Sequence, residues 1–272
     1  MIQMTRLFYI FIFLVTMTAI SCSREGTGDK DDASTITIAG STSVMPFTEK
    51  LAEYFMLDHP DFVINVQGGG STAGVQACLN RTVDIGMSSR NLKDDEKTLN
   101  TITICNDGIA IVVHPNNTIN NLTLEQIRDI FNGRIKNWKD LGWIDRRIDA
   151  VTREEGSGTR GSFEELVMNK MEIDDGIMVQ DSNGSVKEII ATDPYAIGYI
   201  SLGLLDKRVK GLAIDGIAPT VENIKNGSYL IVRPFLFITN GTPGEKVRLF
   251  IDYVLSNDGQ TILKKEGLID IM

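Results

Sequence analysis

Serine, threonine, glycine and arginine gather in a few short segments of this sequence, and together they could hold an anion. One such segment is REEGSGTRG at residues 153–161, where two arginines flank two glutamates and hydroxyl residues alternate with glycines. Glycine leaves backbone amides accessible to a ligand, and serine and threonine hydroxyls donate or accept hydrogen bonds. The segment is therefore a candidate for an anion site, for a nucleophilic serine or for a simple turn.

Three further segments share this design, namely GSTSV at residues 40–44, GGGSTAG at residues 68–74 and MSSR at residues 87–90. In each, a predicted strand ends and a helix is expected to follow. A helix N-terminus presents unpaired N–H groups and the positive end of the helix dipole, so it attracts anions. A single serine at a helix start is most often only an N-cap. Four such turns, two of them with arginine, favour a site for a tetrahedral oxyanion.

The sequence lacks the patterns of an enzyme that acts on phosphate or on esters. It contains neither a G-x-x-x-x-G-K-[ST] P-loop nor a G-x-S-x-G nucleophile elbow. Its two histidines, His59 and His114, each precede a proline, where a turn or surface residue is the usual interpretation. Without a histidine or lysine placed to activate it, Ser157 is a poor nucleophile. No catalytic residue is expected.

The elements that must position these turns alternate along the chain. Residues 35–39, 61–67 and 83–89 have the composition of strands, and residues 47–58 and 75–82 have the apolar spacing of helices. The repeated order of strand, polar turn and helix predicts an α/β fold of parallel βαβ units. In such a fold the turns meet at the carboxyl ends of the strands, where ligands usually bind.

The N-terminal residues predict export and membrane attachment. One positive charge at Arg6 precedes an uncharged apolar run over residues 7–20 and small residues before Cys22. This pattern predicts a lipoprotein signal peptide at residues 1–21 with acylation of Cys22; the alternative is an ordinary signal peptide and an incidental cysteine. Residues 22–34 are polar and charged, as in a flexible tether.

Charge and cysteine content limit the partners. The net charge is −9 and no basic run stands out, which argues against a nucleic-acid surface. Cys78 and Cys105 have no histidine nearby and do not form a zinc pattern. In an exported protein they could form a disulfide or be buried as separate thiols, and the sequence leaves both open. No metal or cofactor is expected.

Six motifs in a fixed order resemble a known family. They are GSTSVMP, GGGSTAGV, TVDIGMSSRNL, DGIAIVV, REEGSGTRGSF and AIGYISLG. Together they make the chain similar to the phosphate-binding proteins of the bacterial high-affinity phosphate ABC transporter, in the short lipoprotein branch. The resemblance implies the type II periplasmic-binding fold, in which two α/β domains are joined by two crossover strands and the ligand binds in the cleft between them.

The resemblance also implies domain limits. The first domain is expected at residues 35–112 and 235–272, and the second at residues 113–234. Crossover strands are expected near residues 109–114 and 230–237, so that the C-terminal helices return to the first domain. A ligand that touches turns of both domains would favour a closed state.

Site residues are carried over by motif. The resemblance implies phosphate binding by Thr42, Ser43, Val44, Ser71, Ser89, Arg90, Arg153, Ser157, Gly158 and Thr159, with Thr42 as a neighbouring candidate. Arg153 could form a bidentate pair with phosphate oxygens. Glu155 matches the acidic residue that orients this arginine, with a solvated loop charge as the alternative. The turn at residues 181–185 also starts a helix and could face the cleft, with a plain N-cap as the favoured interpretation. Asp84 is interpreted as structural, and Arg160 is not assigned.

The third turn departs from the family pattern. Better-known members carry there an aspartate that accepts the proton of phosphate and repels sulfate, whereas this chain has Ser89 followed by Arg90. Discrimination is then weaker or depends on another acceptor, such as Asp107 or a backbone carbonyl. Asp107 could instead pair with Arg90.

The sequence therefore predicts a lipid-anchored binding protein, facing the periplasm or the cell exterior, that passes inorganic phosphate to an ABC permease. It is expected to be a monomer and not an enzyme. One alternative is a binding protein for another oxyanion, such as sulfate, molybdate or tungstate. A second is a surface adhesion or signalling lipoprotein on the same fold, and a phosphate-ester hydrolase is disfavoured.

Overall fold

The structure is a computed structural model that describes residues 34–169 and 171–271. The signal peptide, Cys22 and nearly all of the tether predicted from the sequence lie outside the described residues. In the described part, strands and helices alternate, and the main sheet has the strand order β2-β1-β3-β11-β4-β8-β6-β7, with β9 also paired to β4. The predicted α/β class is therefore confirmed.

The first part of the sheet is built from βαβ units. Strands β1 (Thr35–Gly40), β2 (Val63–Gly68) and β3 (Ile85–Ser88) pair in parallel. Helix α2 (Met45–Asp58) connects β1 to β2, and helix α3 (Ser71–Leu79) connects β2 to β3. The carboxyl ends of these strands therefore lie at one edge of the sheet, as predicted.

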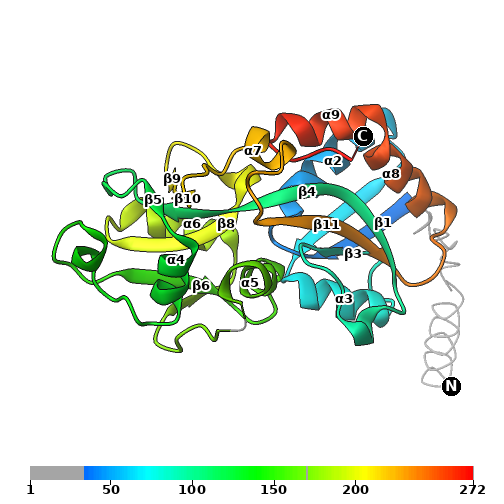
Figure 1. The fold of residues 1–272 in the computed structure, drawn as a ribbon. Coiled ribbons are helices and arrows are strands. Elements are labelled where there is room, and N and C mark those ends of the chain that lie inside the picture. Colours follow the sequence, from blue (N-terminus) through cyan, green and yellow to red (C-terminus); the bar gives the residue numbers. More distant parts are fainter. Residues whose placement is uncertain (1–33, 170, 272) are drawn as a thin grey trace, which may run out of the picture. The chain divides into compact units, whose positions relative to one another are not determined.

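Two long antiparallel strands link the two halves of the sheet. These are β4 (Asn100–Val113) and β11 (Val232–Thr239), which pair from Val232 opposite Gly108 to Thr239 opposite Asn100. Figure 1 shows them running side by side from one half of the sheet to the other. They are the two crossover strands that were expected.

The second part of the sheet continues from β4. Strand β8 (Ala196–Ser201) is antiparallel to β4, β6 (Asp149–Arg153) is parallel to β8, and β7 (Met178–Gln180) is parallel to β6. The helices of this part include α4 (Leu124–Phe131), α5 (Gly158–Phe163), α6 (Asn183–Thr192) and α7 (Val221–Lys225). Helix α5 runs on into a π-helical turn, η4 (Glu164–Met168). The remaining short strands are β5 (Asn121–Leu122), β9 (Lys210–Gly211) and β10 (Ala213–Ile214).

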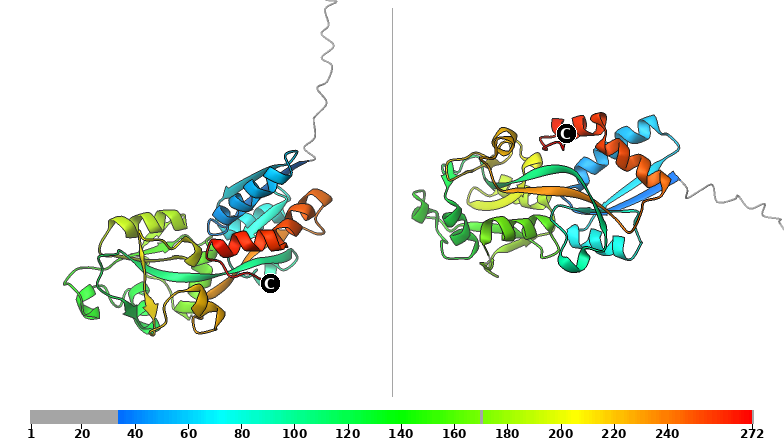
Figure 2. Two further views of the ribbon diagram at one scale, coloured as in Figure 1. Left: turned by 90° about the horizontal axis from the view of Figure 1, so that it is seen from above. Right: turned by 45° about the vertical axis from the view of Figure 1, so that its right-hand side comes forward.

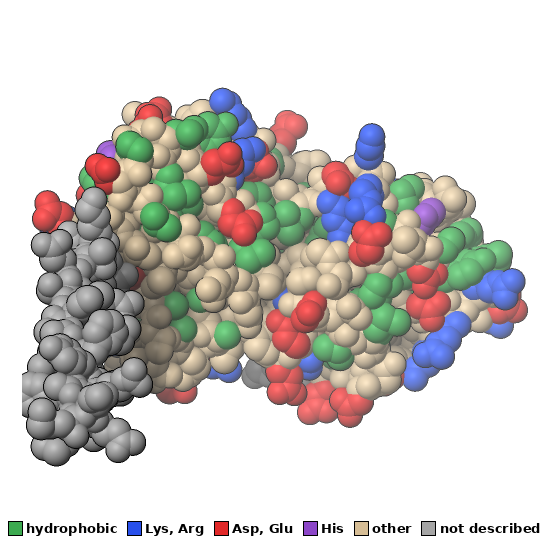
Figure 3. All heavy atoms as spheres, turned by 180° about the vertical axis from the view of Figure 1, so that it is seen from behind, with side chains coloured by type: hydrophobic (Ala, Val, Ile, Leu, Met, Phe, Trp, Pro, Cys, Tyr) green, Lys and Arg blue, Asp and Glu red, His purple; other side chains and the backbone are tan. Residues whose placement is uncertain are grey.

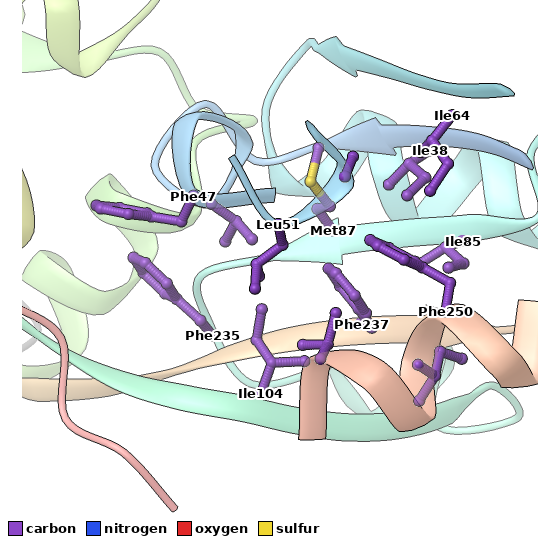
Figure 4. Packing of buried hydrophobic residues seen from close by; sticks show 14 of the residues in the cluster. Ile38, Phe47, Leu51, Ile64, Ile85, Met87, Ile104, Phe235, Phe237 and Phe250 are labelled. Atoms are coloured by element: carbon purple, nitrogen blue, oxygen red, sulfur yellow. The ribbon is translucent and has the colours of Figure 1, made fainter. Parts of the chain in front are cut away.

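One buried hydrophobic cluster lies between the first part of the sheet and helices α2, α8 (Glu245–Leu255) and α9 (Asn257–Lys265). Figure 4 shows Phe47 and Leu51 of α2 facing Phe235 and Phe237 of β11, with Phe250 of α8 close by. The two C-terminal helices pack against α2, as the views in Figure 2 show. Residues from both ends of the described chain therefore share one core.

A second buried cluster lies in the other half and includes Trp138, Phe163 and Tyr199. The rings of Phe163 and Tyr199 stack at 4.0 Å, which fixes α5 against β8. Along β4 the side chains change from the first cluster at Cys105 to the second at Ile109. The domain boundary expected at residue 112 stays a prediction.

The distribution of charged side chains on the surface is consistent with a sequence that has no basic run. On the face shown in Figure 3, acidic and basic side chains are interspersed. Among the described residues, no helix has the length and apolar character needed to cross a membrane.

Candidate anion-binding site

The glycine and hydroxyl turns of the two halves meet and contact each other directly. Ser43, which follows β1, lies with its Oγ 2.7 Å from Oγ1 of Thr159 at the start of α5. The backbone N–H of Thr72 at the start of α3 donates to the carbonyl of Gly156 at 3.1 Å. The side chains of Ser43 and Thr159 are buried, and that of Thr72 is half-buried. Turns distant in the sequence thus form one polar cluster between the halves.

The turn after β3 joins the same cluster through serine hydroxyls. The Ser89 N–H donates to Ser71 Oγ at 3.1 Å, and Ser41 Oγ donates to Ser89 Oγ at 2.9 Å. From the other half, Ser162 Oγ donates to the Ser89 carbonyl at 3.1 Å. This third turn does not begin an α-helix, contrary to expectation, because a loop and the short 3₁₀ helix η2 (Asp94–Glu96) follow it. Ser71 and Ser89 are both fully buried.

Glycine is required where α5 approaches the first half. A Cβ atom at Gly158 would lie 2.1 Å from Ser71 Oγ and 2.6 Å from Ser89 Oγ. Ser157 is the N-cap of α5, because its Oγ accepts from the Arg160 N–H at 3.2 Å. The N-cap interpretation therefore holds for Ser157 even though its turn faces the cluster.

Arg153 ends β6 and is 1% exposed. Its Nη2 donates across to Thr42 Oγ1 at 3.2 Å and to the Asp181 carbonyl at 3.0 Å. Its Nη1 is buried and has no hydrogen-bond partner among the described residues. A buried guanidinium nitrogen without an acceptor is costly, so this atom marks a place for an acceptor that the described part of the chain does not provide.

Glu154, and not Glu155, holds Arg153. The Glu154 carboxylate accepts from Arg153 Nε at 2.9 Å and from Nη2 at 3.0 Å. The chain turns immediately after β6, where the Ser157 N–H donates to the Glu154 carbonyl at 3.0 Å, and this turn leaves the Glu155 side chain exposed. The supporting role predicted for Glu155 is therefore wrong, and its alternative as a solvated loop charge is correct.

Arg90 is buried and paired with Glu96. Its Nη1 and Nη2 donate to the two carboxylate oxygens at 2.7 and 2.9 Å, and Nη2 also donates to Thr72 Oγ1 at 3.3 Å. The hydrogen bond from Arg90 lowers the pKa of Glu96. The suggested pair of Arg90 with Asp107 does not form, because Glu96 takes that place. A direct role of Arg90 in binding stays a prediction.

Asp107 pairs instead with Arg233, a residue that the sequence analysis missed. Arg233 Nε and Nη2 donate to Asp107 Oδ2 at 3.1 and 3.0 Å, and the two residues face each other on the crossover strands. Asp107 Oδ1 accepts from Ser201 Oγ at 2.9 Å and from the Gly203 N–H at 3.4 Å. Burial raises the pKa of Asp107, and the charge of Arg233 opposes that effect. Both carboxylate oxygens are occupied by protein donors, so Asp107 is not placed to accept a proton from a ligand.

Asn183, in the turn at residues 181–185, also reaches the cluster. Ser182 caps α6 by accepting from the Ser185 N–H at 3.0 Å, as the N-cap interpretation requires. Asn183 itself is buried, and its Nδ2 donates to Ser43 Oγ at 2.7 Å. Asn183 could have been found as a polar residue in a glycine-serine turn. Arg233 could have been found as a lone charge in the apolar strand β11.

The remaining predicted residues have clear positions. The Val44 N–H donates to the Ser41 carbonyl at 3.1 Å. Arg160, unassigned before, donates to Glu164 at 2.7 Å and to the Arg153 carbonyl at 3.0 Å. Asp84 accepts from the Thr37 N–H at 2.8 Å, which is the structural role expected for it.

The two cysteines in the described residues are not joined. Cys78 and Cys105 are both buried and free. Burial raises the pKa of each thiol.

Comparisons with known proteins identify the family to which this chain and its polar cluster belong. A family profile described as a PBP superfamily domain matches residues 25–258, which defines the class of protein. The phosphate-binding protein PstS of Bacillus subtilis is 35% identical over 257 residues, covering 92% of this chain and 85% of that protein. This chain belongs to the PstS family of phosphate-binding proteins, so the family resemblance of the six motifs is confirmed.

Solved structures support the same fold. A phosphate ABC transporter substrate-binding protein from Clostridium perfringens with bound phosphate is 41% identical, with a TM-score of 0.85 over 88% of this chain and 100% of that chain. An ABC-type phosphate transport receptor from Vibrio cholerae is 38% identical, with a TM-score of 0.72 over 86% of this chain and 99% of that chain. The predicted periplasmic-binding fold is therefore confirmed.

Proposed function

We propose that this chain captures inorganic phosphate between its two halves and delivers it to an ABC permease. The observation that carries the proposal is Arg153 Nη1, a buried donor that has no acceptor among the described residues and lies beside hydroxyl turns from both halves. A phosphate oxygen at this nitrogen would supply the missing acceptor and a charge-assisted hydrogen bond. The names of the relatives from Bacillus subtilis and Clostridium perfringens point to the same ligand.

The charge arrangement suits an anion in an acidic protein. Three buried arginines surround the cluster, and each has a carboxylate partner, in the pairs Arg153–Glu154, Arg90–Glu96 and Arg233–Asp107. The partners hold the guanidinium planes in position before the ligand arrives, which reduces the ordering cost of binding. Short hydrogen bonds from Ser43, Ser71, Ser157 and Thr159 and from the backbone N–H of Gly158 would then complete the shell.

The turns of both halves contribute to this shell, so the anion would stabilise the arrangement in which the halves touch. A ligand shifts an equilibrium only by its differential affinity for the two states. Hinge motion on the crossover strands β4 and β11 would open the site for entry and release. The domain limits proposed for this motion are residues 35–112 with 235–272 and residues 113–234.

The wider setting follows from the same proposal. The chain acts outside the cytoplasm as a monomer, attached to the membrane by a lipid at Cys22, and it performs no chemistry on its ligand. Its partner is the permease of an ABC transporter. Among the other tetrahedral oxyanions, sulfate is the main competitor, because Ser89 stands where a repelling aspartate was expected.

Calorimetric titration with phosphate, sulfate and molybdate tests the proposal. Phosphate should bind in a 1:1 ratio and more tightly than the other two anions near neutral pH. Replacing Arg153 with alanine should cost about 2–5 kcal/mol of binding free energy, because it removes a buried charge partner of the ligand. Phosphate that binds no more tightly than sulfate, or an unchanged affinity in Arg153→Ala, would refute the assignment.

A further inference from the structure

A ring of five residues connects the crossover strands to both halves of the molecule. The ring consists of Ser43, Asp107, Asn183, Ser201 and Arg233, and we call it the Ser43 ring. Ser201 Oγ donates to Asp107, Asp107 accepts from Arg233, and Arg233 Nη2 donates to Ser43 Oγ at 3.2 Å. Asn183 Nδ2 donates to Ser43 Oγ at 2.7 Å, and Asn183 Oδ1 accepts from the Ser201 N–H at 3.2 Å. All five side chains are at most 2% exposed.

The direction of each hydrogen bond to Ser43 is fixed by its neighbours. The Ser201 N–H can only donate, so the carbonyl oxygen of the Asn183 amide must face Ser201 and its NH₂ group must face Ser43. Arg233 has no acceptor atom, and Asp107 and the Ser89 carbonyl, 3.4 Å from Nη1, hold its orientation. Ser43 Oγ therefore receives two hydrogen bonds that cannot be reversed.

This arrangement leaves Ser43 one role toward a ligand. A serine hydroxyl has two acceptor lone pairs and one proton, and Asn183 and Arg233 use both lone pairs. Its proton is thus the only group left, and it points toward Thr159 Oγ1, 2.7 Å away in the opposite turn. An anion bound between these turns meets Ser43 as a donor and not as an acceptor.

We propose that Asn183 and Arg233 are positioning residues that make Ser43 an obligate hydrogen-bond donor, and that this favours ligand oxygens without a proton. The inference rests on the proposed capture of an oxyanion and specifies which protonation state the site prefers. With both Asp107 oxygens and both Ser43 lone pairs occupied, neither of these two residues can accept a hydrogen bond from a ligand O–H group. The dianion of phosphate, with one O–H group, should therefore bind better than the monoanion with two.

The wild-type protein gives the first test, through the ratio of phosphate to sulfate affinity measured by calorimetry on both sides of the second pKa of phosphate. The charged groups that face the Ser43 turn are Asp107 and Arg233 on β4 and β11 and Arg153 with Glu154 at the end of β6. Sulfate keeps its charge over this range, so titration of these protein groups affects both anions and cancels in the ratio. The ratio should rise as the pH rises, and a flat or falling ratio overturns the inference.

The second test reverses one hydrogen bond with Asn183→Asp, a change that preserves shape. Here Ser43 would donate to the new carboxylate and present a lone pair to the ligand. Sulfate has only acceptors, so its affinity should fall about 10-fold more than that of phosphate, the factor that corresponds to one hydrogen bond. The pH dependence of the ratio should also flatten, because Ser43 can now accept from a ligand O–H group.

Gly184→Asp is the matched control, because it adds the same charge at the next residue of α6, which is exposed, and among the described residues a Cβ there meets only Ser182 Oγ at 3.8 Å. It should change both affinities by the same factor. If Asn183→Asp also changes both equally, the positioning role is wrong although phosphate capture stands. If wild-type protein binds neither anion, the proposed function and this inference fall together.

Discussion

Gly158 and Ser71 face each other across the two halves so closely that no side chain fits between them. A Cβ atom at position 158 would lie 2.1 Å from Ser71 Oγ. Gly158 is the first residue of α5 and Ser71 is the first residue of α3, so two helix N-termini meet at this point. The contact explains why a glycine stands among the hydroxyl residues of this turn, and it makes position 158 a sensitive probe of closure.

Gly158→Ala should weaken phosphate binding by about 5- to 150-fold, because overpacking of this kind typically costs about 1–3 kcal/mol. The clash lies between the halves and not within one core, so the melting temperature without phosphate should change little. Calorimetry and thermal unfolding measure the two effects. Gly244→Ala is the control, since a Cβ there meets nothing within 4 Å. Equal phosphate affinity in both variants would contradict the closed geometry.

Glu154→Gln should lower phosphate affinity, whereas Glu155→Gln should leave it nearly unchanged. The reason is that Glu154 holds the guanidinium of Arg153 through Nε and Nη2, while Glu155 is exposed to solvent. Loss of a charge-assisted hydrogen bond costs about 1.5–3 kcal/mol, only part of which would appear in binding. Phosphate titrations of the two variants side by side decide the matter. The reverse order of effects would restore the role first predicted for Glu155.

Glu96→Gln should destabilise the protein at neutral pH and much less in acid. Arg90 lowers the pKa of Glu96 below its ordinary value of 4.5, so the pair stabilises the fold above that pH and the contribution is lost as the pH falls through the lowered pKa. Breaking a buried pair costs about 3–5 kcal/mol. Urea unfolding over a pH series measures the difference from wild type. A difference that stays constant into the acid range would mean that the carboxylate charge is not the cause.

The thiols of Cys78 and Cys105 should resist a thiol reagent in the folded protein and react after denaturation. Both are buried and free, and burial raises their pKa, so little reactive thiolate forms. The experiment uses a Cys22→Ala variant so that only these two thiols are counted. Fast labelling of the native protein would contradict the burial, and absence of labelling after denaturation without reductant would indicate a disulfide.

The four turns could be predicted from the sequence because their signal is local. Glycine, serine and threonine between a strand and a helix already specify an anion-attracting geometry, as at residues 68–74 and 153–161. The fixed order of the six motifs then made it possible to predict the fold and the family as well. The turn after β3 was the exception, because no local feature distinguishes a following loop from a helix.

The pairing of the arginines could not be predicted, because it depends on contacts between distant segments. Asp107 and Arg233 are 126 residues apart and meet only through the register of β4 and β11. For Arg153, two glutamates follow in sequence, and the tight turn after β6 selects the first. Asn183 was missed for the same reason, since its partner Ser43 lies in the other half.

A crystal structure of the protein with phosphate tests the central claim most directly. The account predicts one phosphate between the two halves, with an oxygen within hydrogen-bonding distance of Arg153 Nη1 and with Ser43 and Thr159 in contact with the same anion. Phosphate bound at another place, or a complex in which Arg153 Nη1 still has no acceptor, would contradict it.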